Sequence, residues 1–293
     1  MTELQKKEYD MLCLLVNICN KLDLTYYLVC GSALGAVKYG GFIPWDDDID
    51  VALPREDYER FLQEAPSMLP EWCFVQNYRT DPRCHALGTK MRDSRTTFVE
   101  RMCENLNIHH GVFIDVFPLD GCWSSQAEYK AFRKQRRIVD GKRRVHLTYR
   151  RFSPSGILPL RATFYYVINR CFGGYSDTAK AIGTFETLSA SFPIATSSLW
   201  CNHANSASEL EYAPSDQYGK GIMVSFEGLE VRVPENIDAY LTQKYGDWRA
   251  DLPVEQQVGH HYYEILDLHH PYTAYIDKVS KGGGRITLKK TLD

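Results

Sequence analysis

An acidic stretch near the N-terminus, Trp45-Asp46-Asp47-Asp48-Ile49-Asp50-Val51, decides which fold and which chemistry the chain predicts. Its second half alternates apolar residues with aspartates, which is the pattern of a half-buried β-strand. Because alternate strand residues face the same side, the carboxylates of Asp48 and Asp50 are predicted to share one metal ion. The same alternation cannot bring all four aspartates to one side, so Asp46 and Asp47 are expected to play supporting roles.

Apolar segments flank the acidic run on both sides. Residues 24–30 have the composition and length of a strand and lead into Gly31 and Ser32, which predict a turn before a short helix over 33–39. On the other side, Pro54 predicts the start of a further helix. Backbone N–H groups at such a turn and helix N-terminus can hold phosphate oxygens beside the metal.

Three other interpretations of this region are open. The aspartates are typical of a solvated surface loop, although their apolar flanks draw them toward the core. They also occupy the first, third and fifth positions of an EF-hand calcium loop, but Val51 stands where that loop requires glycine and Asp57 where it requires glutamate. Gly31 and Gly35 are also compatible with ordinary turns.

A third carboxylate is expected if the site binds a second metal ion or needs a base. Asp115 is the candidate, since it lies in the strongly apolar segment 111–120, which predicts a buried strand. It would bind a metal ion or accept the proton of an attacking hydroxyl; the alternative is a buried Asp satisfied by backbone N–H groups. Asp120 precedes Gly121 and predicts a turn.

Two lysines are candidates for phosphate binding. Lys38 lies in the short helix, and Lys90 lies on a predicted strand over 86–92, which follows another over 73–76. Lys38 is also compatible with a solvated helix face. The first twenty-two residues repeat apolar side chains every three or four positions, and they predict an amphipathic helix that packs across the sheet.

Three motifs resemble the LicD family of phosphotransferases, which includes phosphocholine transferases and is related to the fukutin-type ribitol-phosphate transferases. They are the glycine-rich Gly31–Lys38 segment, the Gly41–Asp50 segment and the Phe113–Asp120 segment. Further matching motifs lie near the C-terminus, followed by a histidine at position 260 or 261, of which His260 is our candidate; these motifs are Phe226-Glu227-Gly228, Val233-Pro234, Tyr240-Leu241 and Tyr245-Gly246-Asp247.

The resemblance implies a mixed α/β (α+β) protein with a nucleotidyltransferase-like fold, whose central mixed sheet is flanked by helices. It also implies that Asp48, Asp50 and Asp115 bind Mg²⁺ and act in catalysis, and that Lys38 occupies a basic position of the family. The substrate-binding candidates are Gly31, Ser32, Lys38, Trp45, Lys90 and His260.

The activity that the resemblance implies is transfer of a phosphorylated headgroup from a CDP-linked donor to a hydroxyl of a cell-surface glycan or its lipid-linked oligosaccharide precursor. Phosphocholine is the favoured headgroup. CMP would be released. Ribitol or glycerol phosphate is an alternative headgroup. Two alternatives belong to other classes of protein. One is a nucleotidyltransferase that releases pyrophosphate, and the other is a non-catalytic protein that binds a nucleotide or a membrane.

If choline is the headgroup, an aromatic ring should contact its ammonium. The candidates are Trp45, Trp123, Tyr218 and Trp248, and each of them is equally compatible with a core position.

Composition sets the broad class. With 293 residues and a net charge of −3, the chain is an ordinary globular protein. Residues 1–10 lack the apolar part of a signal peptide and no apolar run is long enough to span a membrane, so a cytoplasmic location is expected. The nine cysteines lack metal-ligand spacing and predict free thiols, and the three His-His pairs are not expected to bind metal.

Residues 124–215 differ from the rest and predict a basic helical insertion, between a catalytic core over 1–123 and a C-terminal part over 216–293 that completes it. Between Lys130 and Arg170 there are twelve basic residues and one acid, next to an apolar segment over 157–172. This composition predicts peripheral contact with an anionic membrane at its inner face, or with a lipid-linked acceptor. No nucleic-acid-binding motif accompanies the charges, so nucleic acid is not an expected partner.

Overall fold

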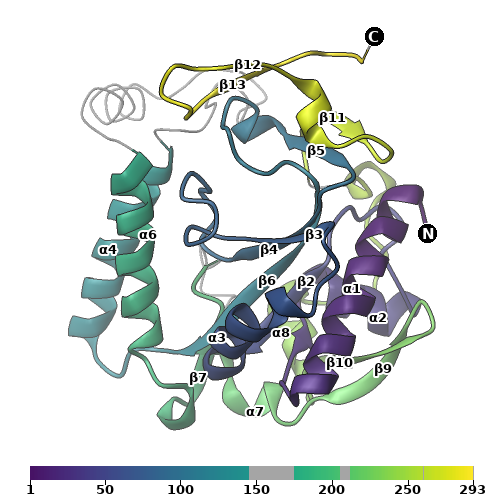
Figure 1. The fold of residues 1–293 in the computed structure, drawn as a ribbon. Coiled ribbons are helices and arrows are strands. Elements are labelled where there is room, and N and C mark those ends of the chain that lie inside the picture. The colour runs from purple at the N-terminus through teal and green to yellow at the C-terminus, as the bar shows by residue number, and fades with distance from the viewer. Residues whose placement is uncertain (145–174, 205–211, 260, 293) are drawn as a thin grey trace.

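Seven strands form the central sheet of the computed structural model, which describes residues 1–144, 175–204, 212–259 and 261–292 (Figure 1). The strand order is β1-β2-β6-β4-β3, and β7 and β8 continue the sheet from β6. The strands β2 and β6 are parallel and the other pairs are antiparallel. The bounds are β1 Tyr27–Leu28, β2 Asp50–Pro54, β3 Cys73–Gln76, β4 Thr89–Asp93, β6 Val112–Gly121, β7 Leu199–Cys201 and β8 Tyr212–Pro214. The predicted mixed α/β class is confirmed.

Three two-stranded sheets surround the central one in the described part of the chain. They pair β5 (Thr97–Glu100) with β11 (Tyr263–Asp267), β9 (Ile222–Phe226) with β10 (Leu229–Val233), and β12 (Ile276–Val279) with β13 (Ile286–Leu288). The C-terminal strand β11 is thereby placed beside β5, far away in sequence, which brings the segment before β11 to the central sheet.

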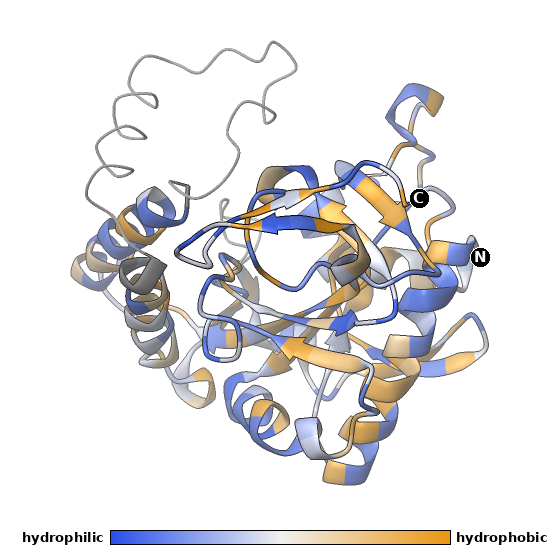
Figure 2. Cartoon of the chain, turned by 45° about the horizontal axis from the view of Figure 1, so that its top comes forward, coloured by the Kyte–Doolittle hydropathy of each residue, from blue (hydrophilic) through white to orange (hydrophobic). Residues whose placement is uncertain are grey.

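The α-helices of the described residues pack around these sheets. They are α1 Glu3–Leu22, α2 Cys30–Tyr39, α3 Arg55–Glu64, α4 Gln126–Arg144, α6 Tyr175–Ala190, α7 Ser215–Tyr218 and α8 Ile237–Tyr245. Short 3₁₀ turns are η1 Ala65–Ser67, η2 Arg101–Cys103, η4 Ile194–Thr196, η6 Val254–Gln256 and η7 Tyr272–Tyr275. In Figure 2 the helices change between hydrophilic and hydrophobic residues along their length, as amphipathic helices do.

The N-terminal amphipathic helix is confirmed as α1. A capping box between Thr2 and Gln5 satisfies its first backbone N–H groups. Met11, Leu12 and Leu15 are fully buried, and the helix contacts β6 and β4. The predicted strand over 73–76 is also confirmed, as β3.

The helices α4 and α6 lie side by side at one edge of the molecule (Figure 1). Phe132 and Val139 of α4 pack against Ile182 and Phe185 of α6 in a small apolar cluster separate from the main core. The strands β7 and β8 also fall between residues 124 and 215 and pair with the central sheet through β6. The division into a core, an insertion and a completing C-terminal part stays a prediction.

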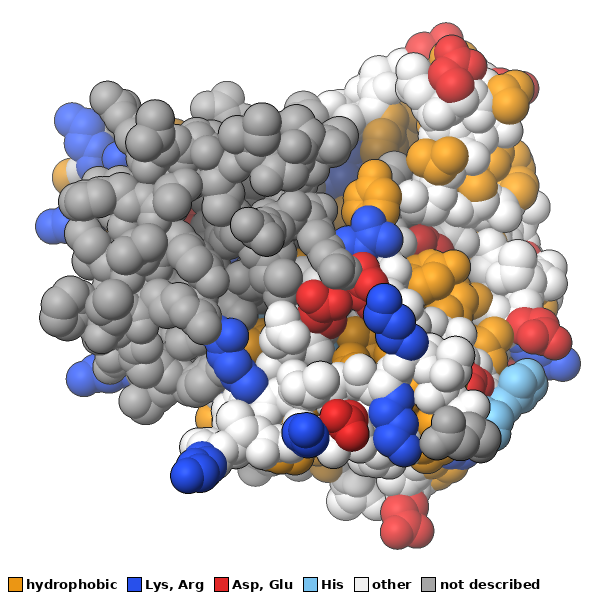
Figure 3. Space-filling model, turned by 90° about the horizontal axis from the view of Figure 1, so that it is seen from above, with side chains coloured by type: hydrophobic (Ala, Val, Ile, Leu, Met, Phe, Trp, Pro, Cys, Tyr) orange, Lys and Arg blue, Asp and Glu red, His pale blue; other side chains and the backbone are white. Residues whose placement is uncertain are grey.

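Part of the basic segment lies on α4, and the remainder, residues 145–170, falls outside the described residues together with the whole apolar segment 157–172. Lys130, Lys134 and Arg137 are exposed along one face of α4, and Figure 3 shows Lys and Arg side chains at the left edge of the molecule, where α4 lies in Figure 1. Arg136 and Arg143 instead turn inward, where their guanidinium groups bind the carbonyls of His203 and His85.

Two local predictions are wrong. The apolar segment 24–30 forms only two residues of strand, and the helix after it begins at Cys30 instead of residue 33. The φ of Cys30 is +52°, so the chain turns sharply at this residue and needs no separate turn at Gly31 and Ser32. Asp120 is not a turn residue: it lies fully buried in β6, because β7 continues the pairing there and the guanidinium of Arg55 binds its carboxylate.

Candidate active site

Three charged side chains lie in one row across the central sheet. Asp50 of β2 is the register partner of Asp115 of β6, and Asp115 is the register partner of Lys90 of β4. Register partners on adjacent strands project from the same face of a sheet. The fold therefore brings together three sequence candidates from three distant segments.

Asp48 joins this row from just outside the strand. The ladder of β2 begins at Asp50, later than the sequence pattern predicts, because residues 44–49 run as an irregular segment. The carbonyl of the fully buried Ile49 nevertheless accepts a hydrogen bond from the amide of Asp115 at 2.8 Å. The alternation of side chains between the two faces therefore continues one step before the start of β2. One carboxylate oxygen from each of Asp48, Asp50 and Asp115 lies within 4.8 Å of the other two.

These three carboxylates fit a divalent cation. Mg²⁺ and Ca²⁺ prefer oxygen ligands, and oxygens this close can reach one ion. Burial raises the pKa of Asp50, and the charges of Asp48 and Asp115 raise it further. Burial likewise raises the pKa of Asp48, which His261 lowers and Asp46 and Asp115 raise, to about 7. A cation would relieve this crowding of negative charge.

Lys90 is held tightly at the end of the row. Its ammonium lies 3.0 Å from Oδ2 of Asp115 and 3.3 Å from the ring centroid of Phe113. Both partners of the ion pair are buried. Lys90 is therefore positioned beside the carboxylates, where a donor phosphate would also lie if the site binds one.

Gly31 and Ser32 occupy the first turn of α2, close to the acidic segment. The hydroxyl of Ser32 accepts a hydrogen bond from the amide of Asp50 at 2.8 Å, which fixes the start of β2. A Cβ atom on Gly31 would lie 2.8 Å from Oδ2 of Asp46, so any larger residue would displace that carboxylate. Both residues thus position aspartates, and their predicted contact with phosphate stays a prediction.

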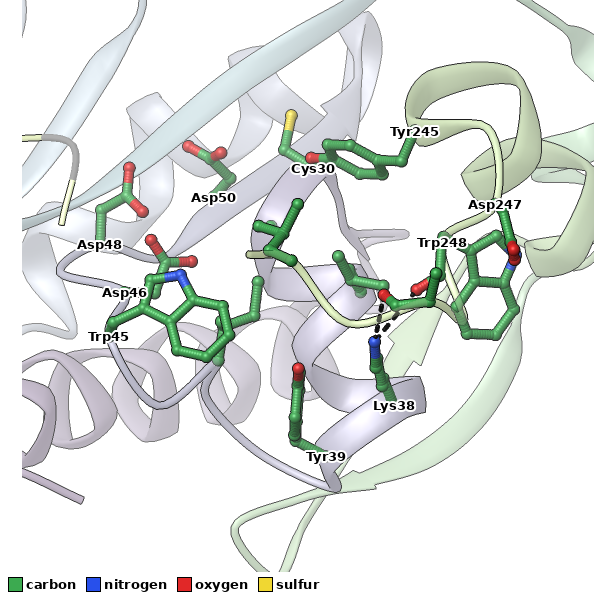
Figure 4. A pocket seen from close by; sticks show the side chains of 15 residues that line it. Cys30, Lys38, Tyr39, Trp45, Asp46, Asp48, Asp50, Tyr245, Asp247 and Trp248 are labelled. Atoms are coloured by element: carbon green, nitrogen blue, oxygen red, sulfur yellow. Dashed lines mark hydrogen bonds between the residues drawn. The ribbon is translucent and has the colours of Figure 1, made fainter. Parts of the chain in front are cut away.

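A cavity of about 280 Å³ opens beside Asp48 and Asp50 (Figure 4). The candidates Gly31, Lys38 and Trp45 line it. The ammonium of Lys38 binds the carbonyl of Ala250 at 2.7 Å and the carboxylate of Asp251 at 3.1 Å. Lys38 thus ties α2 to the segment after α8, and its predicted role in phosphate binding is untested.

The candidate histidine His260 falls outside the described residues, and the structure places its neighbour His261 at the site. The backbone N–H of His261 donates to Oδ2 of Asp47 at 3.1 Å, and its Nδ1 lies 3.2 Å from Oδ1 of Asp47 and 3.9 Å from Oδ2 of Asp48. Burial lowers the pKa of His261, but the hydrogen bond with Asp47 and the charge of Asp48 outweigh it and raise the pKa to about 9. His261 therefore supports the acidic segment from the C-terminal part of the chain.

Sequence reasoning missed two buried polar residues of α1, Gln5 and Glu8, that lie close to the same segment. The amide of Gln5 donates to the carbonyl of Asp46 at 3.0 Å. Glu8 is almost fully buried, and burial and the charges of Asp48 and Asp47 raise its pKa. The only signal in the sequence was the interruption of an apolar helix face by polar residues, which does not name a partner.

The aromatic candidates separate into two groups. Trp45 and Trp248 line the cavity. Trp123 packs against Phe132 in the small cluster of α4 and α6, and Tyr218 is buried in the main core. The latter two therefore do not face the cavity.

Comparison with known proteins agrees with the resemblance in the sequence. Residues 23–139 match a family model described as LicD/FKTN/FKRP, nucleotidyltransferase domain. The chain is 26% identical over 284 residues to the lipopolysaccharide cholinephosphotransferase LicD of Haemophilus influenzae, an alignment that covers 92% of this chain and all of the relative. Both matches confirm the resemblance of the chain to the LicD family.

Two shorter matches were also found. Uncharacterised proteins of Rickettsia typhi and Rickettsia prowazekii are 39% and 37% identical to this chain over 49 residues, which is 17% of the chain and 16% and 18% of the relatives. Within the described residues of the chain, we find no helix with the length and apolar character needed to cross a membrane.

The raised pKa values predict how the stability of this protein depends on pH when no metal is bound. Burial and neighbouring acids raise the pKa of Asp46 to about 6 and of Asp48 to about 7, above the roughly 3.9 of an unfolded Asp. A raised carboxyl pKa stabilises the folded state below the unfolded pKa, and this stabilisation is lost as pH rises through the folded value. The free energy of unfolding in EDTA should therefore fall between about pH 6.5 and about pH 8.

Urea unfolding at several pH values in this window tests the prediction. The window stays above about pH 6.5 because burial lowers the pKa of His85 and His109 to about 3, so these histidines oppose the trend only at lower pH. The raised pKa of His261, about 9, adds to the fall in the same window, so the contribution of Asp48 is the difference from a variant without its carboxylate. The Asp48→Asn variant should show a flatter slope. A slope as steep as that of the wild type would contradict the assignment.

Proposed function

We propose that the chain is a Mg²⁺-dependent phosphotransferase that moves phosphocholine from a CDP-linked donor to a hydroxyl of a cell-surface glycan or its lipid-linked precursor, with release of CMP. The observation that carries this proposal is the row of Asp50, Asp115 and Lys90 with Asp48 beside it, in a chain related over most of its length to a lipopolysaccharide cholinephosphotransferase. The nucleotidyltransferase-like character of the fold belongs to the same proposal.

In this proposal Asp48, Asp50 and Asp115 would hold the metal ion. A bound Mg²⁺ would neutralise the oxygens of the donor diphosphate. Ser32 and His261 keep the carboxylates in place by fixing the amide of Asp50 and the side chain of Asp47. At the other end of the row, the ammonium of Lys90, which pairs with Asp115, donates a hydrogen bond to a phosphate oxygen.

The acceptor hydroxyl attacks the phosphorus distal to cytidine in line with the bond to CMP. The new bond joins the acceptor oxygen to this phosphorus, and the bond between the phosphorus and the CMP oxygen breaks, so CMP leaves with the electron pair. If Asp115 does not bind the metal, it would instead take the proton of the hydroxyl. The protein contributes position and charge and forms no covalent intermediate.

The test is incubation of the protein with Mg²⁺ and a panel of CDP-linked choline, ethanolamine, glycerol and ribitol, with and without candidate glycan acceptors. Chromatography should detect CMP, most rapidly from CDP-choline. Pyrophosphate release from CTP and a phosphorylated headgroup would instead support a nucleotidyltransferase. No CMP from any donor with any acceptor would refute the proposal.

We also propose that the exposed face of α4 contacts the anionic inner surface of the membrane. Lys130, Lys134 and Arg137 recur at intervals of four and three residues along this face, and each basic residue near such a surface contributes about 1 kcal/mol. A triple charge reversal to Glu should reduce sedimentation with anionic vesicles but leave sedimentation with neutral vesicles unchanged. Reversal of Arg143 is unsuitable because this side chain packs inward.

A further inference from the structure

The cavity beside Asp48 and Asp50 has an unusual lining. Large side chains that the core would normally bury stand partly in solvent around it: Tyr39 is 39% exposed, Tyr245 42% and Leu252 48%. Trp45 also lines the cavity, with its ring 6.3 Å from that of Tyr39 in an edge-to-face contact. Exposed apolar side chains gathered around one hollow indicate a binding site.

The elements that carry these rings are held together by specific contacts. Tyr39 ends α2, Trp45 begins the acidic segment, and Tyr245 ends α8. Lys38 connects α2 to the segment after α8 through the carbonyl of Ala250. Figure 4 shows the Trp45 ring beside Asp46 and the Tyr245 ring pointing toward Cys30 and Asp50, so the aromatic lining borders the proposed metal site directly.

The charges around the cavity are predominantly negative. Asp46, Asp48, Asp50 and Asp247 line it, against the single cation of Lys38. The charge of Lys38 is itself matched by Asp251 at 3.1 Å. With Asp48 and Asp50 assigned to the metal ion, Asp46 and Asp247 are left facing the cavity.

The polar groups that a neutral headgroup would need are not part of this lining. Among the described residues, those that line the cavity include no Asn, Gln, Ser, Thr, His or Arg. A polyol such as ribitol presents several hydroxyls, and buried hydroxyls need hydrogen-bond partners. Aromatic faces with nearby carboxylates suit a quaternary ammonium, which attracts rings and requires no hydrogen bonds.

We propose that this cavity holds the quaternary ammonium of the donor headgroup, with Trp45, Tyr39 and Tyr245 as the contacting rings and Asp46 and Asp247 as the balancing charges. This inference rests on the proposed function and deepens it, because it assigns the choice of headgroup to named residues. Trp248 has a structural part, since its indole N–H lies 3.2 Å from Asp238 and Arg249 stacks on its ring.

The test compares CDP-choline with the CDP ester of 3,3-dimethylbutanol, which has the same shape as choline without its charge. Binding of each ligand is measured by isothermal titration calorimetry with the full chain. The wild type should bind CDP-choline roughly tenfold more tightly than the uncharged ester, as expected for a desolvated cation–π contact. Trp45→Leu and Asp247→Asn should each bring this ratio toward one while changing the affinity for the uncharged ester little.

Asp247→Asn keeps the experiment decisive if Trp45→Leu folds poorly, because Asp247 is exposed. Trp72→Leu is the matched control: Trp72 stacks on Arg95 outside the cavity, and its loss should leave the ratio unchanged. Equal wild-type affinities for the two ligands, undetectable binding of CDP-choline, or an equal loss of both affinities in Trp45→Leu would overturn the inference. The last result would place the cytidine in the cavity.

These outcomes are distinct from failure of the proposed function. A protein that transfers glycerol phosphate and binds CDP-choline no better than the uncharged ester would keep the phosphotransferase and lose the ammonium site. A protein that prefers CDP-choline in calorimetry and releases CMP from no donor would keep the site and lose the reaction.

Discussion

Replacement of Asp50 by asparagine is expected to slow CMP release strongly and to make the metal-free protein more stable. Asp50 lies between Asp48 and Asp115, and burial and both charges raise its pKa. Loss of the charge should reduce the rate about 10²- to 10³-fold, the usual effect of removing one preorganised charge-stabilising group. Relief of the repulsion should raise the melting temperature in EDTA by roughly 2–4 °C, the change that about 1 kcal/mol causes in a chain of this size.

Thermal unfolding with and without Mg²⁺, combined with the CMP assay, separates these effects. Mg²⁺ should raise the melting temperature of the wild type, because a ligand that binds only the folded state stabilises it, and it should raise that of Asp50→Asn much less. Asp10→Asn, at an exposed position of α1, is the matched control and should behave as the wild type. Undiminished CMP release by Asp50→Asn, or an equal response to Mg²⁺, would remove Asp50 from the metal site.

Replacement of Arg55 by methionine is expected to cause the largest loss of stability among single changes outside the site. Its guanidinium binds both oxygens of Asp120 at 2.7 Å and lies 3.2 Å from Glu186 of α6. Asp120 is fully buried, so the variant would leave a carboxylate without its cation in the interior. Breaking a buried pair in this way costs about 3–5 kcal/mol.

Urea unfolding measures this loss against a control on the same helix. Arg60 pairs with Glu64 on the exposed surface of α3, and Arg60→Met should cost less than about 1 kcal/mol. The double variant with Arg55→Met and Asp120→Leu should recover much of the stability, because it leaves no buried charge unpaired. If Arg55→Met were no more harmful than Arg60→Met, the contacts of Arg55 with Asp120 of β6 and Glu186 of α6 would contribute nothing to stability.

Local patterns predicted the elements well where one physical signal dominated. The amphipathic repeat of α1 and the strand β3 were predicted at nearly their observed bounds. Where the signals were mixed, the prediction failed: residues 24–30 are as apolar as a strand, yet only Tyr27 and Leu28 find a partner in β2. Burial by packing and pairing in a ladder favour the same residue types, so composition does not separate them.

The candidate site shows the same limit. Asp48 and Asp50 were placed on one side by alternation alone. The sequence offered Asp115 as a third carboxylate and Lys90 as a phosphate-binding candidate. The register that brings Asp50 beside Asp115 and Lys90 joins strands that are far apart in sequence, and no local pattern encodes it. The partners of Lys38 at Ala250 and Asp251 had no signal in the sequence, because backbone carbonyls and exposed acids occur throughout it.

The sequence by itself determined the resemblance to a family, the mixed α/β class and the paired carboxylates of the acidic stretch, because these depend on short motifs and on the period of a strand. Only the tertiary structure decided which residues surround those carboxylates. Gln5 from α1, His261 from the segment before β11 and Tyr245 from the end of α8 converge there from the two ends of the chain. Such convergence results from the packing of whole helices and strands, and no local pattern encodes which distant side chains that packing brings together.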